Sequence, residues 1–179
     1  MSTEIMNAHD AIRSRRSVRR FDPSRTVSDE ALHTILDCAM SAPTAVNSRE
    51  WSFVVARSPE TRTALADAHP YCKFAKLDGA VCIVLCATPS MERAPGHWQH
   101  DCGACAENAL VAAAALGIGA TWASIHPHED RVAGFRRVLQ LPEDVVPFCI
   151  LTFGYPPAGE PLAVRPSRYD AAKVHTEKW

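Results

Sequence analysis

The segment CGACAENALVAAAALG, residues 102–117, decides how the fold of this chain is predicted. Residues 98–116 have the pattern of one long helix, and Gly117 stands where a left-handed residue commonly ends a helix. Nearly all side chains in the segment are small, so another backbone can approach closely. The helix therefore either lies deep in the core or pairs with a second subunit, and the residues alone leave both alternatives open.

The flanking sequence mixes strands with further helices. An uninterrupted apolar run, GAVCIVLCA at 79–87, predicts a central buried strand. Strands are also predicted at 51–56 and 147–154, and residues 120–125 form either a short strand or a loop. Further helices are predicted near 5–14, 28–42, 58–69 and 128–140. This order predicts a single α+β layered domain over residues 1–179, with a proline-rich extended arm at 155–179.

The composition is that of an ordinary soluble domain. The chain has 179 residues, 47% of them hydrophobic, and a formal net charge of −1. A nearly neutral chain lacks the broad basic face that nucleic acids or membrane surfaces require, so neither is an expected partner. Seven cysteines are spread through apolar segments, which favours buried thiols in a reducing compartment. With no recognisable signal peptide, the sequence predicts a cytoplasmic protein.

Basic residues gather in the segment AIRSRRSVRRF at 11–21. Arg15, Arg16 and Ser17 lie where the first helix gives way to extended chain, and they could converge on a small anion such as phosphate. The alternative is a solvated charged face. The tail segment VRPSRYD adds Arg165 and Arg168, and two separate clusters could close on one phosphate, which shifts the balance toward an anion site.

Other segments carry weaker signals. In SAPTAVNSREW at 41–51, Asn47 offers both a donor and an acceptor, which suits the polar edge of a ring, although the same residues make an ordinary turn. Cys102 and Cys105 have CxxC spacing, but an alanine-rich helix favours inert core thiols over a redox pair. HWQHD and HPHED are interpreted as helix starts rather than metal ligands. No metal site is expected, and no side-chain arrangement for acid–base or nucleophilic catalysis stands out.

Five segments, in this order along nearly the whole chain, are similar to the signatures of the FMN-dependent nitroreductase family. They are AIRSRRSVRRF, SAPTAVNSREWSFVV, DCGACAENALVAAAALGIGATW, LPEDVVPFCILTFGYPP and SRYDAAKVHTEKW. The resemblance implies a three-layer α+β sandwich with a central, mainly antiparallel sheet, assembled as a homodimer. The long helices would pack across the dimer axis, the arm at 155–179 would embrace the partner, and two FMN molecules would sit at the interface.

The resemblance also implies which residues bind the cofactor. They are Arg15, Arg16, Ser17, Arg19, Pro43, Thr44, Ala45, Asn47, Arg49, Trp122, Ala123, Ser124, Arg165 and Arg168. Residues 15–17 would hold the FMN phosphate and ribityl chain, Arg19 would approach the pyrimidine edge, and Arg168 would return to the phosphate from the tail. Residues 43–49 and 122–124 would lie on either side of the flavin ring. Arg13 and Arg20 are expected to be ordinary surface charges.

The activity implied is a two-step transfer. NAD(P)H would reduce the bound FMN and leave, and a small electron acceptor such as a nitroaromatic or a quinone would be reduced in its place. Arg49 stands where the family often has a neutral amide (NSREW against NSQPW), and this leaves the substrate range open. Ser124 and Ile125, where many relatives have an acidic residue and a glycine, do the same.

Two alternatives remain at this point. An enzyme of the same fold could carry out other chemistry, such as dehalogenation or enoate reduction, but such relatives usually need a lid, for which residues 88–97 are too few. The other alternative is a non-enzymatic module that binds anions or nucleic acids through the arginine cluster. A yellow flavin colour in the purified protein would exclude the second.

Overall fold

The computed structural model describes residues 5–179, and at its centre lies a four-stranded antiparallel sheet. The strands are β1 (Trp51–Ala56), β2 (Val81–Ala87), β3 (Gly119–Ser124) and β4 (Val146–Gly154), in the spatial order β1-β2-β4-β3. Every residue of β2 is buried, as its uninterrupted apolar run predicts. Of the two possibilities for residues 120–125, the structure has the strand, and β3 forms one edge of the sheet.

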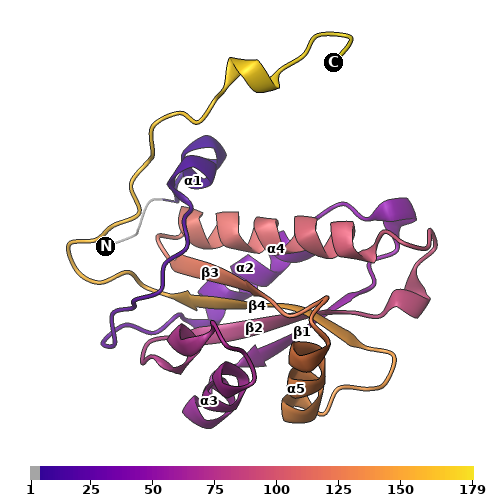
Figure 1. The fold of residues 1–179 in the computed structure, drawn as a ribbon. Coiled ribbons are helices and arrows are strands. Elements are labelled where there is room, and N and C mark those ends of the chain that lie inside the picture. Colours follow the sequence, from indigo (N-terminus) through magenta and orange to yellow (C-terminus); the bar gives the residue numbers. More distant parts are fainter. Residues whose placement is uncertain (1–4) are drawn as a thin grey trace.

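Helices cover both faces of this sheet (Figure 1). The α-helices of the described chain are α1 (Ala8–Ser14), α2 (Asp29–Met40), α3 (Pro59–Asp67), α4 (Trp98–Ala115) and α5 (Glu129–Leu139). Figure 1 shows α4 and α2 on one face and α3 and α5 on the other. Because side chains alternate along a strand, Leu85 enters the core under α4 while its neighbour Val84 packs in the core that contains Phe135 of α5. The predicted α+β fold with helices on both faces is confirmed.

Local signals in the sequence set most helix boundaries. Ser28 and Ser58, the first residues of the segments predicted as helices, cap α2 and α3 through their side chains. Gly117, with a φ of 70°, follows the end of α4. Helix α1 begins at Ala8, later than the predicted start near residue 5, because the side chain of Asn7 accepts a backbone N–H and fixes the first turn there. None of the helices between residues 5 and 179 is long and apolar enough to cross a membrane.

The small side chains of α4 let it lie deep in the fold. Cys105, Ala109 and Ala113 are at most 2% exposed and belong to the core between α4, α2 and the sheet. The core alternative is therefore confirmed for this side of α4. On another side, Val111 and Ala115 line an open, mainly apolar hollow of about 590 Å³ together with residues of α1 and α2.

The chain after β4 runs as an extended arm, as predicted. Within the described residues, the arm contains one short 3₁₀ turn, η4 (Ala171–Lys173), and no α-helix or strand. In Figure 1 the arm passes α1 and continues away from the sheet. Its large side chains at Tyr169 and Trp179 are 75% and 101% exposed, so the arm buries little of its own apolar surface within one chain.

Arginines of the N-terminal segment attach the beginning of the arm. Arg13 Nη2 donates to the carbonyl oxygen of Arg165 at 2.6 Å. Arg20 forms an ion pair with Glu160, in which Nη2 donates to both carboxylate oxygens at 3.0 and 2.9 Å. The prediction that Arg13 is an ordinary surface charge is wrong, since its partly buried guanidinium binds the backbone of the arm. Arg20 is a surface charge as predicted, 74% exposed within its ion pair.

Candidate functional site

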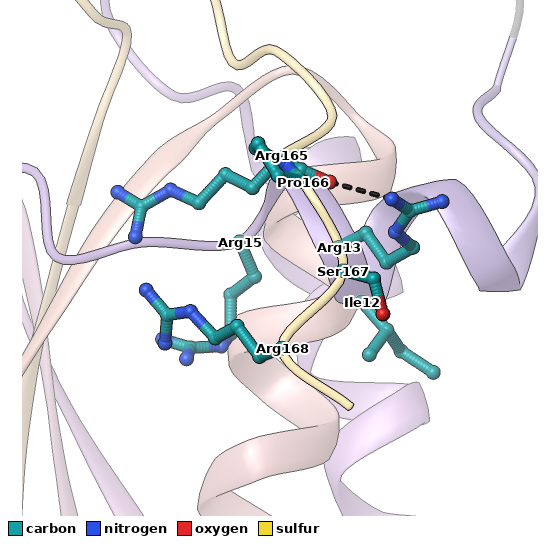
Figure 2. A pocket seen from close by; sticks show the side chains of 7 residues that line it. All are labelled: Ile12, Arg13, Arg15, Arg165, Pro166, Ser167 and Arg168. Atoms are coloured by element: carbon teal, nitrogen blue, oxygen red, sulfur yellow. Dashed lines mark hydrogen bonds between the residues drawn. The ribbon is translucent and has the colours of Figure 1, made fainter. Parts of the chain in front are cut away.

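A pocket with a volume of about 260 Å³ lies between the end of α1 and the arm. We call it the arginine pocket; its lining residues are Ile12, Arg13, Arg15, Arg165, Pro166, Ser167 and Arg168. Figure 2 shows the guanidinium groups of Arg15, Arg165 and Arg168 on one side of the arm and that of Arg13 on the other. The structure thus brings arginines from the two sequence clusters, which are about 150 residues apart, into one pocket.

The N-terminal wall of the arginine pocket is fixed by the sheet. Helix α1 ends at Ser14, and the extended chain that follows forms a parallel bridge between Ser17 and Ala120 of β3. The N–H of Val18 donates to the Ala120 carbonyl at 2.9 Å. Gly119 permits this approach, because a Cβ at that position would lie 2.8 Å from the Val18 side chain. Arg15 is therefore held between a helix end and a strand edge.

The arginine pocket carries an excess of positive charge. Arg15 Nε lies 3.0 Å from Oε1 of Glu107 on α4, and this ion pair is partly exposed. Within residues 5–179, no ion pair or hydrogen bond engages the guanidinium of Arg165 or Arg168. Of the three guanidiniums on one side of the arm, only that of Arg15 is thus paired with a carboxylate among the described residues. Guanidinium groups bind phosphate and carboxylate oxygens through paired N–H donors, so the pocket is suited to an oxyanion.

Arg16 and Arg19 lie in a different place from Arg15. They line a neighbouring hollow of about 190 Å³ with Ser17 and with residues 156, 157 and 160 of the arm. Arg16 Nη2 donates to the Pro161 carbonyl at 2.6 Å, so its guanidinium is engaged with the arm. The side chain of Arg19 forms no ion pair within the described chain and stays available for a further anionic group.

The loop at residues 43–49, between α2 and β1, has an unusual backbone. Val46, Asn47 and Arg49 have φ angles of 53°, 56° and 54°, a left-handed conformation that is uncommon outside glycine. Two hydrogen bonds support it: the N–H of Arg49 donates to Thr44 Oγ1 at 3.2 Å, and Arg49 Nε donates to Asn47 Oδ1 at 2.8 Å. Oδ1 of Asn47 thus accepts from Arg49. Among residues 5–179, the side-chain N–H groups of Asn47 have no acceptor and can donate to a ligand.

A buried carboxylate ties this loop to α4. The N–H of Ala45 donates to Oδ2 of Asp101, in the first turn of α4, at 2.9 Å. Directly after the loop, Glu50 is only 1% exposed, and neither of its carboxyl oxygens has a hydrogen-bond partner among residues 5–179. Burial raises the pKa of Glu50, and the neighbouring Asp101 raises it further. Sequence reasoning missed Glu50; an acidic residue at the start of an apolar strand was the signal available.

Trp122, Ala123 and Ser124 end the edge strand β3. Trp122 packs edge-on against Phe148 at 5.8 Å between ring centroids, and Phe148 packs likewise against Trp98 at 5.9 Å. The carbonyl of Ser124 accepts from Arg131 Nη1 at 2.8 Å, which fixes the end of the strand. Through Trp98 and Asp101, the first turn of α4 therefore contacts both the aromatic cluster beside β3 and the loop at 43–49.

The cysteine and histidine motifs take structural places. Cys102 and Cys105 are fully buried free thiols, and burial raises the pKa of Cys105 to about 12, so it stays uncharged at neutral pH. Helix α5 begins at Glu129 within HPHED, and α4 begins at Trp98 within HWQHD, as predicted. Over residues 5–179, no group of three or more His, Cys, Asp or Glu side chains is placed to hold a metal ion.

This chain is similar to known proteins both in sequence and in structure. A candidate NADH dehydrogenase/NAD(P)H nitroreductase of Methanothermobacter thermautotrophicus is 41% identical over 174 residues, which cover 97% of this chain and 88% of that protein. The crystal structure of a candidate NADH oxidase from Clostridium acetobutylicum superposes with a TM-score of 0.89 at 33% identity, covering 95% of this chain and 100% of that one.

A third similar protein, a candidate nitroreductase from Desulfovibrio desulfuricans, was solved in complex with FMN. It has a TM-score of 0.77 and 25% identity, and the match covers 97% of this chain and 98% of that one. The sequence model of the Nitroreductase family matches residues 12–69 and 69–155, which include the N-terminal arginines, the loop at 43–49 and all four strands. This chain therefore belongs to the Nitroreductase family.

Proposed function

We propose that the chain is an NAD(P)H-dependent FMN oxidoreductase that reduces small electron-poor acceptors such as nitroaromatics or quinones. The observation that carries the proposal is the arginine pocket, where, among residues 5–179, Arg15 is paired with the carboxylate of Glu107 and Arg165 and Arg168 have no anionic partner. A phosphate monoester would supply the missing negative charge. Family membership and the FMN complex of a similar protein support FMN as the molecule that bears this phosphate.

The residues present fit FMN in charge and in donor chemistry. In this proposal Arg15, Arg165 and Arg168 hold the phosphate through charge-assisted hydrogen bonds. Ser17, which is exposed on the extended chain beside β3, offers a hydroxyl for the ribityl chain, and Arg16 holds the arm in place beside it. Arg19 lies one step further along the same segment, where a cation would stabilise negative charge on the pyrimidine edge of a reduced ring.

The loop at 43–49 and the end of β3 would flank the ring. Pro43, Thr44 and Ala45 give one wall a fixed backbone, and the free N–H groups of Asn47 would donate to the polar ring edge. Trp122, Ala123 and Ser124 would lie on the other side, supported by the aromatic packing of Trp122 on Phe148. FMN, when bound, supplies the hydride chemistry, accepting from NAD(P)H and donating to the acceptor.

The chain's own part in catalysis is then positioning and electrostatics. No catalytic side-chain acid or base is assigned, because the cofactor carries the bond-breaking step. The sequence has no G-x-G-x-x-G motif of the kind that holds a resident dinucleotide, which is in keeping with a nicotinamide that visits and leaves. Whether NADH or NADPH is preferred is decided by comparing turnover with each.

A homodimer is part of the same proposal. The apolar hollow beside Val111 and Ala115 and the exposed arm residues Tyr169, Val174 and Trp179 are surfaces that one copy leaves uncovered. In a twofold assembly the arm of each copy, residues 155–179, would lie over its partner, and the arginine pocket would sit near the interface. The domain itself would comprise residues 1–179.

The experiment that tests the proposal is flavin analysis of the purified protein. We expect a yellow protein whose flavin spectrum persists after desalting, which releases FMN on denaturation and is reduced by NAD(P)H under anaerobic conditions. A panel of nitroaromatic, quinone, halogenated and enoate acceptors then identifies the chemistry from the rate of flavin reoxidation. A colourless protein that binds polyanions in a salt-sensitive way would refute the proposal and support the anion-binding module instead.

A further inference from the structure

Glu50 and Asp101 form a buried carboxyl pair that the proposed function does not use directly. Glu50 is 1% exposed and Asp101 is 7% exposed. Both oxygens of Glu50 lack any donor, whereas Asp101 accepts the N–H of Ala45 through Oδ2. Within residues 5–179, neither carboxyl forms an ion pair with a lysine, arginine or histidine.

The side chains that act on the pKa of Glu50 are all acidic, and only its own backbone N–H opposes them. Asp101 and Cys102 approach it from α4, and Glu92 approaches from the segment before α4. The Glu92 carboxylate is turned to the N–H groups that begin α4, where it accepts from Trp98 at 2.7 Å. Two like charges in a buried site oppose each other's ionisation, and no cation compensates them here.

The basic side chains nearest in sequence are directed elsewhere. Arg49 uses its Nε for Asn47, and Arg93 is exposed and donates its backbone N–H to Ser48. His97 and His100 on the first turn of α4 are exposed. A proton is therefore the simplest group that can neutralise the pair, as in the carboxyl dyads of aspartic proteases.

We propose that Glu50 and Asp101 share one proton, and that the pair holds the loop at 43–49 in its left-handed conformation. The carboxylic O–H of Glu50 donates to Asp101, and Asp101 in turn accepts the N–H of Ala45. Glu50 is thus a positioning residue for the loop. Its effect on a flavin ring rests on the function proposed above, whereas the shared proton does not.

The direction of the pH dependence follows from the buried position. Burial is the main cause that raises the pKa of Glu50 above its ordinary value of 4.5; its own backbone N–H opposes the shift, and the neighbouring carboxyl groups of Asp101 and Glu92 add to it. The folded state therefore keeps a proton that the unfolded chain releases above about pH 4.5. The contribution of the pair to stability is complete below pH 4.5 and is lost as the pH rises through the folded pKa.

The test compares unfolding by denaturant from pH 4.5 to 9 in the wild type, Glu50→Gln and the control Glu143→Gln, an exposed carboxylate in the turn before β4. Glutamine keeps a donor toward Asp101 but cannot ionise. We expect the unfolding constant of the wild type to rise more over this range than that of Glu50→Gln, because only the wild type can release the proton of Glu50. The control should follow the wild type.

Parallel pH profiles for the wild type and Glu50→Gln would overturn the proposal. So would stabilisation of the wild type, but not of Glu50→Gln, by potassium or calcium chloride, because a cation and not a proton would then neutralise the pair. If Glu50→Gln fails to fold, the infrared carbonyl band of a buried carboxylic acid just above pH 4.5, where an ordinary glutamate is mostly ionised, decides, measured in the wild type against Asp101→Asn. Its absence from the wild type would refute the shared proton.

A second readout separates positioning from mere stability. Hydrogen exchange of the Ala45 amide is followed by NMR as the pH rises. In the wild type, its rate should increase by more than intrinsic base catalysis predicts over the pH range in which Glu50 loses its proton. In Glu50→Gln the rate should follow intrinsic base catalysis alone. In flavin-loaded protein, the visible spectrum should shift over the same pH range in the wild type alone. Failure to bind flavin would refute the proposed function and leave the unfolding and exchange measurements intact as tests of the pair.

Discussion

Replacing Arg168 with alanine removes one of the cations from the arginine pocket and should weaken FMN binding. Arg168 lines the pocket together with Arg15 and Arg165 and has no partner of its own among the described residues. A hydrogen bond to a charged group contributes about 1.5–3 kcal/mol. Arg168 is exposed, so solvent screening favours the low end of that range. Since 1.4 kcal/mol corresponds to tenfold in affinity, we expect the Kd for FMN to rise about tenfold.

The assay is a fluorescence titration of flavin-free protein with FMN at several salt concentrations. Arg168→Ala should also reduce the salt dependence of binding, because one fewer cation faces the phosphate. Arg137→Ala is the matched control: Arg137 is an exposed arginine in the last turn of α5 and lines no part of the pocket. If Arg168→Ala binds FMN as tightly as the control, with the same salt dependence, the assignment of this pocket to the phosphate is refuted.

Other substitutions test the surroundings. Gly119→Ala should destabilise the fold by about 1–3 kcal/mol in urea unfolding, because its Cβ would lie 2.8 Å from Val18; unchanged stability would contradict the close approach. Glu107→Gln frees Arg15 and should tighten FMN binding up to about fivefold; weaker binding would show that the ion pair orders the pocket. Backbone hydrogen bonds lower the pKa of Glu92 despite an opposing desolvation effect, so its stabilising contribution is lost as pH falls below 4.5. Glu92→Gln should reduce the fall in melting temperature at acidic pH. An unchanged fall would show that Glu92 does not stabilise the start of α4.

Features that depend on a few neighbouring residues could be predicted from the sequence. The start of α3 at Ser58 and the buried strand at 81–87 are each determined by residues within one short segment. The long helix was predicted for the same reason, since Gly117 marks its end. The convergence of the two arginine clusters was also anticipated, because both clusters are visible as runs of charge.

Features set by tertiary contacts could not be predicted in the same way. The left-handed conformation at Val46 has no glycine to signal it, and the loop is held instead by Asp101 from a distant helix. Glu50 is buried beside Asp101 and Cys102 of α4, a neighbourhood that the local sequence pattern does not record. The partner of Arg13 is the backbone carbonyl of Arg165, 152 residues away. A backbone atom leaves no mark in the sequence, so the pattern of charges does not reveal this contact.

Helix α4 contacts each of these separate features. Trp98 in its first turn reaches the aromatic cluster, Asp101 holds the loop at 43–49, and Glu107 binds Arg15 of the arginine pocket. With a rise of 1.5 Å per residue, Asp101 and Glu107 are about 9 Å apart along the axis, a distance in keeping with an elongated ligand that has a phosphate at one end and a ring at the other. The small side chains between them set how closely this helix approaches the sheet, so the alanine-rich segment governs both fold and site geometry.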